Sequence, residues 1–204
     1  MYVELLHYTP LNIAVKAIRN CWQSTAKSDS NCYEIGEKDK ELLRKIIYQN
    51  QHTSTIEHIH YNFFIAGISR GCLQELARHR LASFSVKSTR YTLRELKNAE
   101  DLSKFLVLTG DEVIDDANWG QLEYIRTLLR TAGSIPNDKL KYLLPEAYKT
   151  ELYFSINARS LRNLLSLRLS NRAHFEIKEL AEKLLKSIPE VHSILYEDFL
   201  CDSK

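Results

Sequence analysis

The chain has 204 residues, of which 44% are hydrophobic and 26% charged, and its net charge is +2. This composition is typical of a globular protein that buries a core without disulfides or structural metal. The charge is too small to identify a nucleic-acid or membrane partner. The four cysteines form no CxxC pair, which argues against a zinc knuckle and a redox dithiol. The N-terminal segment has neither a signal peptide nor a membrane span, so we expect one cytoplasmic domain over residues 1–204.

The N-terminal segment predicts a strand followed by two helices. Residues 2–7 alternate weakly, and Thr9-Pro10 is typical of a helix N-terminus because threonine caps free N–H groups and proline fits the first turn. The polar run 24–36 favours a mobile loop. The helices are expected to bury Leu11, Val15, Ile18 and Trp22 in the first, and Leu42, Leu43, Ile46 and Ile47 in the second.

The clearest strand is HIHYNFFIAGI at residues 58–68, where apolar and polar side chains alternate. His58 and His60 share one face of such a strand, which is compatible with metal chelation. A polar face on a half-buried strand explains the pair more simply, so we predict no metal site. A helix is expected from about Ser69, and the β-branched and aromatic residues of 83–92 favour an extended segment.

The C-terminal half predicts mostly helices. The clearest one runs from about Asn118 to Gly133, and glycine is a typical C-terminal stop. Residues 150–157 favour a strand that leads into a helix, and 173–199 predict two helices separated near Pro189. The expected fold class is therefore α+β, a helix-rich protomer around a short antiparallel sheet.

Two windows of the chain hold several arginines and no acidic residue. One lies between Glu75 and Glu95, and the other between Glu151 and Glu176. A guanidinium matches phosphate or carboxylate oxygens bidentately, so clustered arginines indicate anion recognition. From charge alone, a solvated basic face is an equally good interpretation. Nucleic-acid binding is weaker, because no nucleic-acid motif accompanies the arginines. The arginines are Arg78, Arg80, Arg90 and Arg94 in the first window, and Arg159, Arg162, Arg168 and Arg172 in the second.

The string RHRLASFSVKSTRY at residues 78–91 carries the most specific signal. RHR followed after seven residues by Ser88, and then by Arg-Tyr, resembles the signature of flavin-dependent thymidylate synthases. The resemblance extends to HTSTIEH at 52–58 and to NARSLRN at 157–163, which is followed by Leu-Arg at 167–168. These blocks span about residues 52–177, most of the chain, and within them 98–135 shows no clear correspondence.

Membership in this family implies an α+β protomer in a homotetramer whose active sites are shared between subunits. It also implies a reaction, the methylation of dUMP to dTMP. Methylenetetrahydrofolate is the implied carbon donor, and FAD reduced by NADPH is the implied source of reducing equivalents. The chain has only 6 glycines and no GxGxxG, so a Rossmann turn would not hold the FAD. We expect these small molecules as ligands, and neither nucleic acid nor membrane.

The resemblance also assigns roles to residues by position. Arg168 is the implied catalytic residue, because a guanidinium beside the uracil favours the anionic ring that reaction at C5 requires. Ser88 invites a nucleophile interpretation, but the sequence assigns it no base, and we interpret it as a ligand-orienting donor. The expected dUMP-binding residues are Glu75, Arg78, Val86, Lys87, Ser88, Thr89, Arg90, Lys141 and Arg168. The expected FAD-binding residues are Ser54, His79, Arg80, Leu81, Asn157, Arg159 and Asn163.

Four positions depart from the family pattern. Glu75 stands where many members have glutamine, and we expect it to meet sugar hydroxyls or the base. Lys141 replaces a common arginine, so a point charge stands in place of a fork. Val86 replaces an acidic residue of some members and would act through its backbone, and Cys21 is expected to pack within its helix. Two rival functions stay open, a nucleotide- or RNA-binding module and a different flavin oxidoreductase.

Overall fold

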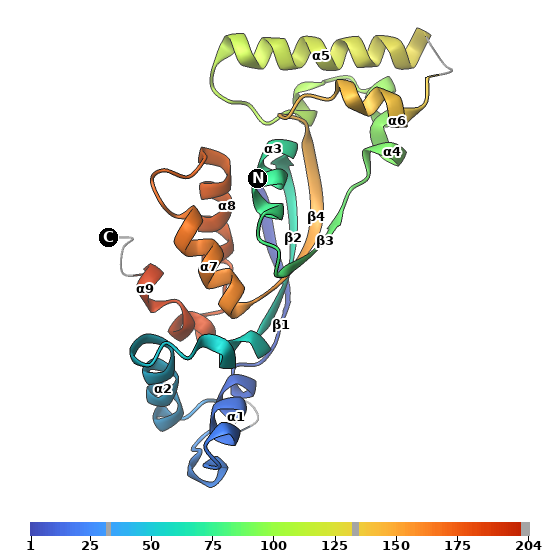
Figure 1. Ribbon diagram of the computed structural model, residues 1–204. Coiled ribbons are helices and arrows are strands. Elements are labelled where there is room, and N and C mark those ends of the chain that lie inside the picture. Colours follow the sequence, from blue (N-terminus) through green and yellow to red (C-terminus); the bar gives the residue numbers. More distant parts are fainter. Residues whose placement is uncertain (32–33, 132–134, 201–204) are drawn as a thin grey trace. The chain divides into compact units, whose positions relative to one another are not determined.

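The computed structural model describes residues 1–31, 34–131 and 135–200. They form helices and a four-stranded antiparallel sheet with the strand order β1-β2-β4-β3 (Figure 1), which confirms the predicted fold class. The strands are β1 (Tyr2–Tyr8), β2 (His60–Ser69), β3 (Ala82–Val86) and β4 (Lys149–Asn157). The helices are α1 (Asn12–Cys21), α2 (Glu37–Arg44), α3 (Arg70–Ala77), α4 (Thr89–Thr92), α5 (Glu112–Thr131), α6 (Asn137–Leu140), α7 (Ala158–Arg168), α8 (Phe175–Lys186) and α9 (Glu197–Leu200).

Shorter turns of helix connect these elements. They are the 3₁₀ segments η1 (Thr25–Lys27), η3 (Thr53–His58), η4 (Leu93–Asn98), η5 (Ser103–Phe105), η6 (Lys141–Leu143) and η7 (Glu190–Leu195), and the π-helical segment η2 (Lys45–Gln49). Among the described residues, no helix has both the length and the apolar character needed to cross a membrane.

The chain divides into two compact units. Unit 1 comprises Met1–Tyr2, Ile65–Arg78 and Phe84–Tyr153. Unit 2 comprises Val3–Phe64, His79–Ser83 and Phe154–Lys204. The division passes through all four strands, so each strand contributes residues to both units.

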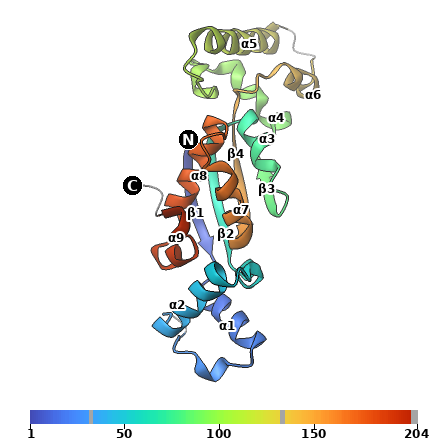
Figure 2. The same cartoon turned by 60° about the vertical axis from the view of Figure 1, so that its left-hand side comes forward.

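Aromatic residues of the strands form the centre of the unit 2 core. Tyr61, Phe63 and Phe154 are fully buried, and the Phe63 and Phe154 rings stack with centroids 6.3 Å apart. Helices α7 and α8 lie side by side over these strands (Figures 1 and 2). The burial of Tyr61 and Phe63 confirms the alternation predicted for 58–68, and each such side chain stabilises the fold by roughly 2 kcal/mol.

The start of α1 differs from the prediction. Thr9 does not cap this helix, which begins at Asn12 without a side-chain cap. Its Oγ1 instead accepts a hydrogen bond from the His60 backbone N–H at 3.2 Å, because Thr9 still pairs with β2 at the end of β1. At the other end of α1, Trp22 and Cys21 are exposed. The expected burial of Trp22 and the expected packing of Cys21 were therefore wrong, since both residues lie where the helix turns away from the core.

The described part of the polar run 24–36 is held by a buried carboxylate. Asp39 accepts hydrogen bonds from Arg19 at 2.9 and 2.5 Å, and from the hydroxyls of Ser28 and Ser30 at 2.5 and 2.6 Å. Burial raises the pKa of Asp39, but these hydrogen bonds outweigh burial, and its pKa lies below the usual value. The polar composition predicted a loop, whereas these contacts between distant residues were not visible in the sequence.

Two boundaries near the sheet also correct the sequence predictions. His58 ends η3, and β2 begins at His60, so the two histidines do not share a strand face as expected. The segment 83–92 is extended only as far as Val86. Its last four residues form α4, because the backbone turns into a helix after Ser88.

Unit 1 has a core of its own beneath α5. Leu122, Ile125 and Leu129 are buried at helical spacing on one face of α5. They pack with leucines of η4. The helix begins earlier than predicted, at Glu112, and the predicted stop at Gly133 lies outside the described residues.

The C-terminal part of unit 2 agrees with the prediction in part. Helix α8 and the break near Pro189 were expected. The second predicted helix is instead two short pieces, η7 and α9. The side chains of η7 that are buried, including His192 and Leu195, hold this segment in the core of unit 2.

Candidate functional site

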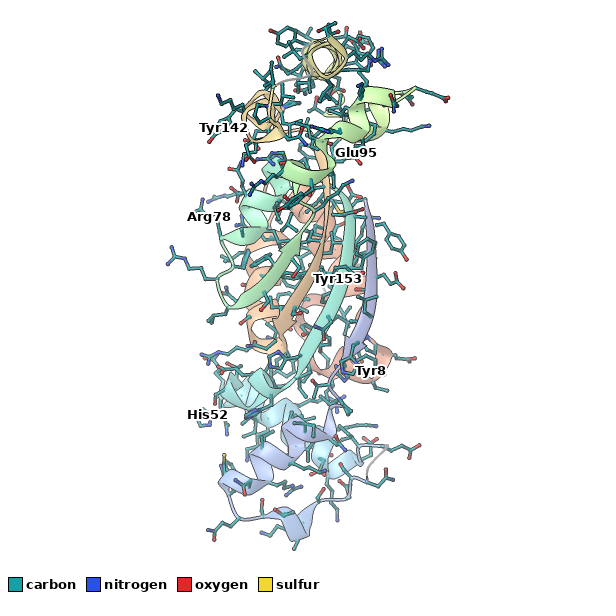
Figure 3. All side chains as sticks on the ribbon, turned by 90° about the vertical axis from the view of Figure 1, so that its right-hand side faces the viewer. Tyr8, His52, Arg78, Glu95, Tyr142 and Tyr153 are labelled. Atoms are coloured by element: carbon teal, nitrogen blue, oxygen red, sulfur yellow. The ribbon has the colours of Figure 1, made fainter. Side chains whose placement is uncertain are left out.

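The RHR triplet connects α3 to β3 and presents its side chains in two directions. Arg78, labelled in Figure 3, and Arg80 are exposed, whereas His79 is only 8% exposed. The imidazole Nε2 of His79 accepts a hydrogen bond from Arg168 Nε at 3.1 Å. Arg168 is the half-buried last residue of α7. The structure thus joins two sequence-predicted site residues that are 89 positions apart.

A second group of predicted residues forms where η3 meets α7 in unit 2. Arg159 Nη1 contacts Glu57 Oε1 at 2.5 Å. Ser54 precedes Glu57 by three residues in a 3₁₀ segment, where such residues share a face. Asn163 follows Arg159 by four residues in an α-helix and lies on the same face. Three predicted FAD residues, Ser54, Arg159 and Asn163, therefore lie in this ion pair or on the same helix face as one of its members, and all three are exposed.

The two other predicted FAD residues have different surroundings. Asn157 is the N-cap of α7, and its side-chain oxygen accepts a hydrogen bond from the Ser160 N–H at 2.8 Å. This is the structural role that asparagine commonly has at a helix start, so its contact with FAD stays a prediction. Leu81 follows the RHR triplet and is 77% exposed, and its contact with FAD also stays a prediction.

In unit 1, the residues after β3 are tied to neighbouring elements. The Lys87 N–H donates to the Glu151 carbonyl at 2.9 Å, next to β3 and β4. Lys87 Nζ also donates to Glu95 at 3.0 Å, and the hydroxyl of Tyr148 donates to the other Glu95 oxygen at 3.0 Å. Burial, followed by the nearby Glu95 charge, raises the pKa of Tyr148. Lys87 is therefore positioned by an acid that the sequence did not assign to the site, next to the half-exposed Val86.

Ser88 and Arg90 lie at the start of α4. The carbonyl of Ser88 accepts the first helical hydrogen bonds, while its hydroxyl makes no capping bond. Arg90 Nε lies 3.3 Å from Asp138, and the side chain of Asn137 donates to the Arg90 carbonyl at 2.8 Å. An open pocket of about 370 Å³ is found here. Its lining residues are Arg90, Tyr91, Arg94, Pro136, Asn137 and Asp138.

The remaining predicted dUMP residues are also in unit 1. Glu75 is half-buried on α3, three residues before Arg78. Thr89 is the half-buried first residue of α4. Lys141 begins η6, and its Nζ lies 5.9 Å from the ring centroid of Tyr142 (Figure 3), which is 84% exposed.

Arg162 of the second arginine window is paired with other residues of the chain. Its guanidinium donates to Asp198 at 2.8 and 2.6 Å and to the Leu195 carbonyl at 2.5 Å. It also lies over the Tyr48 ring, 5.3 Å from the centroid. Arg162 therefore joins elements of the chain itself, which neither anion recognition nor a solvated basic face describes. The sequence reasoning missed Glu57 and Asp138 as arginine partners, although the charge of Glu57 inside the resembling segment 52–58 was a usable signal.

Comparison with known proteins tests the resemblance. The family described as thymidylate synthase complementing protein matches residues 4–192. The flavin-dependent thymidylate synthase of Campylobacter jejuni (strain RM1221) is 49% identical to this chain over 208 residues, which cover 98% of each protein. The chain belongs to the flavin-dependent thymidylate synthase family.

Further comparisons support this membership over the full length. The flavin-dependent thymidylate synthase of Helicobacter pylori (strain J99 / ATCC 700824) is 49% identical, with 98% of this chain and 99% of the relative covered. The crystal structure of thymidylate synthase X from Helicobacter pylori with FAD and dUMP superposes with a TM-score of 0.90 at 49% identity, covering 97% of this chain and 98% of that one. The resemblance based on the RHR string is thereby confirmed.

Proposed function

We propose that this chain, working as one domain over residues 1–204, converts dUMP to dTMP by reductive methylation at C5. Methylenetetrahydrofolate would supply the carbon, and NADPH would supply the electrons through FAD. The observation that carries the proposal is the coincidence of a full-length family match with the joining of His79 and Arg168. These two residues come from the two most specific sequence blocks.

Arg168 is the residue that we assign to the chemistry. Methylation at C5 needs electron density on that carbon, and loss of the N3 proton makes the uracil ring anionic. A guanidinium close to the ring stabilises this charge, most effectively where its orientation is fixed beforehand. Arg168 is half-buried and held by His79, and both properties increase the electrostatic effect of its charge.

The donor set of unit 2 fits FAD. Arg80 and Arg159 are exposed guanidinium groups of the kind that pairs with a pyrophosphate. Ser54 and Asn163 are exposed as well and supply neutral hydrogen-bonding groups suited to hydroxyls and ring edges. His79, Leu81 and Asn157 complete the proposed set. When bound, FAD supplies the reducing equivalents, while the chain's own residues bind and orient.

The proposed dUMP residues of unit 1 supply the phosphate and sugar contacts. Arg78 and Arg90 are exposed guanidinium groups, and the hydroxyl of Ser88 makes no capping bond. The complete set is Glu75, Arg78, Val86, Lys87, Ser88, Thr89, Arg90 and Lys141, together with Arg168. Ser88 is proposed as an orienting donor, so Ser88→Ala should raise the dUMP dissociation constant but keep measurable turnover. Loss of all turnover with dUMP still bound would contradict this role.

The proposal includes a homotetramer with shared active sites, located in the cytoplasm. Several large apolar side chains are exposed beside proposed ligand residues, and such side chains commonly mark interaction surfaces. They are Leu81, Tyr91 and Tyr142, at 77%, 76% and 84% exposure. The exposed thiol of Cys21 suits a reducing compartment. Light scattering should give four times the 23.7 kDa chain mass, and a monomeric mass for the active protein would contradict shared sites.

The activity itself is tested by chromatographic detection of dTMP. Purified protein is incubated with dUMP, methylenetetrahydrofolate, NADPH and FAD, and each component is omitted in turn. We expect dTMP only in the complete mixture. Tight dUMP binding without any flavin requirement would instead favour a nucleotide-binding module, and flavin reduction without any dTMP would favour a different flavin oxidoreductase.

A further inference from the structure

His79 is buried between two exposed arginines, and its chemical state follows from its partner. A guanidinium has only donors, so the nitrogen that meets Arg168 Nε at 3.1 Å must be an acceptor. An imidazole accepts at Nε2 only when it is neutral and carries its proton on Nδ1.

The hydrogen bond to His79 is donated by Nε of Arg168, and this choice of nitrogen determines what the bond can fix. Nε is the nitrogen closest to the aliphatic stem of arginine. A bond at Nε fixes the rotation of the guanidinium plane, and with it the directions of the two terminal nitrogens. Arg168 is also the last residue of α7, where less of the helix surrounds the side chain. A long side chain there has many rotamers to lose on ligand binding, and His79 removes part of that freedom in advance.

We propose that His79 is the positioning residue for Arg168. It holds the guanidinium plane in the orientation that stabilises the anionic uracil, through neutral Nε2 and Arg168 Nε. The inference rests on the proposed function, in which Arg168 acts on the ring. Within the RHR triplet, the buried histidine thus orients a residue from another element in addition to its proposed place in the FAD set, whereas the two exposed arginines meet ligands only. A lysine or arginine at position 79 could not accept this hydrogen bond.

The test uses two amide substitutions that differ in reach. In His79→Gln, the side-chain oxygen can occupy the place of Nε2 and accept from Arg168. In His79→Asn, the amide reaches only the place of Nδ1, so the acceptor is lost. With saturating FAD and methylenetetrahydrofolate, we expect His79→Asn to lower kcat for dTMP formation about 100-fold, the size typical of a misplaced catalytic group. His79→Gln should lose less than about fivefold, and KM for dUMP should change less than kcat in both.

A double-mutant cycle with Arg168→Ala separates positioning from a purely structural or cofactor role. If His79 acts through Arg168, then His79→Asn should cause almost no further loss in the Arg168→Ala background. Equal losses in His79→Gln and His79→Asn, or losses that add to that of Arg168→Ala, would overturn the proposal. Failure of the wild type to form dTMP would overturn the proposed function instead, which keeps the two failures distinguishable.

Two further measurements do not depend on His79 variants being active. Arg168→Lys keeps the charge but has no Nε–H for the imidazole, and we expect its kcat to fall as far as that of His79→Asn. Crystal structures of the holoenzymes should show the Arg168 guanidinium rotated from its wild-type orientation in His79→Asn and retained in His79→Gln. An unmoved guanidinium in His79→Asn would overturn the proposal irrespective of any activity.

Discussion

Two regions of unit 2 share helix α7 and use arginine in opposite ways. The proposed FAD surface, formed by Ser54, Arg159 and Asn163, has exposed side chains and one surface ion pair to Glu57. The C-terminal anchor, formed by Tyr48, Tyr61, Arg162 and His192, has mostly buried groups that bond to the chain near its end. Arg159 and Arg162 are three residues apart in the same acid-free window. The role of an arginine in this window therefore depends on its partner and its burial, and not on the clustering of charge.

The anchor fixes the segment that contains η7 and α9. The hydroxyl of Tyr48 donates to the Ile194 carbonyl and accepts from the Glu197 N–H, both at 2.9 Å. His192 is fully buried, with Nδ1 2.8 Å from the Tyr61 hydroxyl. Burial lowers the pKa of His192 to about 4. The anchor should therefore control stability, and the FAD surface and Arg168 should control activity.

The largest expected effect is on catalysis, at the end of α7. Arg168→Ala should lower kcat/KM for dTMP formation by about 100- to 1,000-fold, because it removes the charge that stabilises the anionic ring. Steady-state kinetics measures the loss. Arg172→Ala removes an exposed arginine of the same window and should retain kcat/KM within about twofold, as surface substitutions usually do. Equal losses in the two variants would mean that net charge, and not Arg168 itself, supports activity.

The next effect is a pH dependence of the unfolding free energy, which arises from His192 in the C-terminal anchor. His192 has a folded-state pKa of about 4, below the usual 6.5. Above pH 6.5 both the folded and unfolded states are neutral there, so stability is highest. As the pH falls from 6.5 to 4, the unfolded state binds the proton first, and up to about 3 kcal/mol of unfolding free energy is lost.

Urea denaturation across this pH range measures the loss. His192→Asn does not titrate, and its amide can still meet the Tyr61 hydroxyl. The unfolding free energy of this variant should therefore fall less between pH 6.5 and 4 than that of the wild type. Parallel pH curves for the two proteins would show that His192 is not the titrating group.

The third effect is a loss of stability in the Arg162→Ala variant. Arg162→Ala removes hydrogen bonds to Asp198 and the Leu195 carbonyl, and the packing over Tyr48. The unfolding free energy should fall by about 2 kcal/mol, as measured by urea denaturation at pH 7.5. The folded variant should bind FAD with near wild-type affinity. A large change in FAD affinity without a change in stability would show that Arg162 takes part in FAD binding.

The smallest expected effect comes from Arg159→Ala. Its ion pair with Glu57 is exposed, so the unfolding free energy should change by less than about 1 kcal/mol. The FAD dissociation constant should rise about tenfold, which corresponds to about 1.4 kcal/mol, and flavin fluorescence titration measures it. Together with Arg162→Ala, this variant gives a reciprocal control. A stability loss like that of Arg162→Ala, with unchanged FAD affinity, would show that Arg159 and Arg162 have the same structural role.

The sequence predicted the elements whose side chains follow a simple period. The alternation in 58–68 indicated β2, and the spacing of Leu122, Ile125, Leu128 and Leu129 indicated α5. Prediction failed where a contact distant in sequence decided the local structure. Thr9 pairs with His60 instead of capping α1, and the hydrogen bond between Ser28 and Asp39 had no local signal in the sequence.

The candidate site could be predicted as a set of residues but not as an arrangement. The RHR string and the NARSLRN segment identified the chain's family, yet neither indicated that His79 turns inward to meet Arg168. The charge pattern alone likewise did not distinguish Arg159 from Arg162, because their partners Glu57 and Asp198 lie 102 and 36 residues away. Hydrogen-bonding partners at such separations have no local sequence pattern.

The central claim is that one protein binds FAD and dUMP together for reductive methylation. The most direct measurement is the visible absorption spectrum of the purified protein, recorded anaerobically before and after addition of NADPH and of dUMP. We predict a flavin band that bleaches with NADPH and changes shape when dUMP is added. A colourless protein that also fails to bind added FAD would contradict the claim and leave the exposed arginines as a general anion-binding surface.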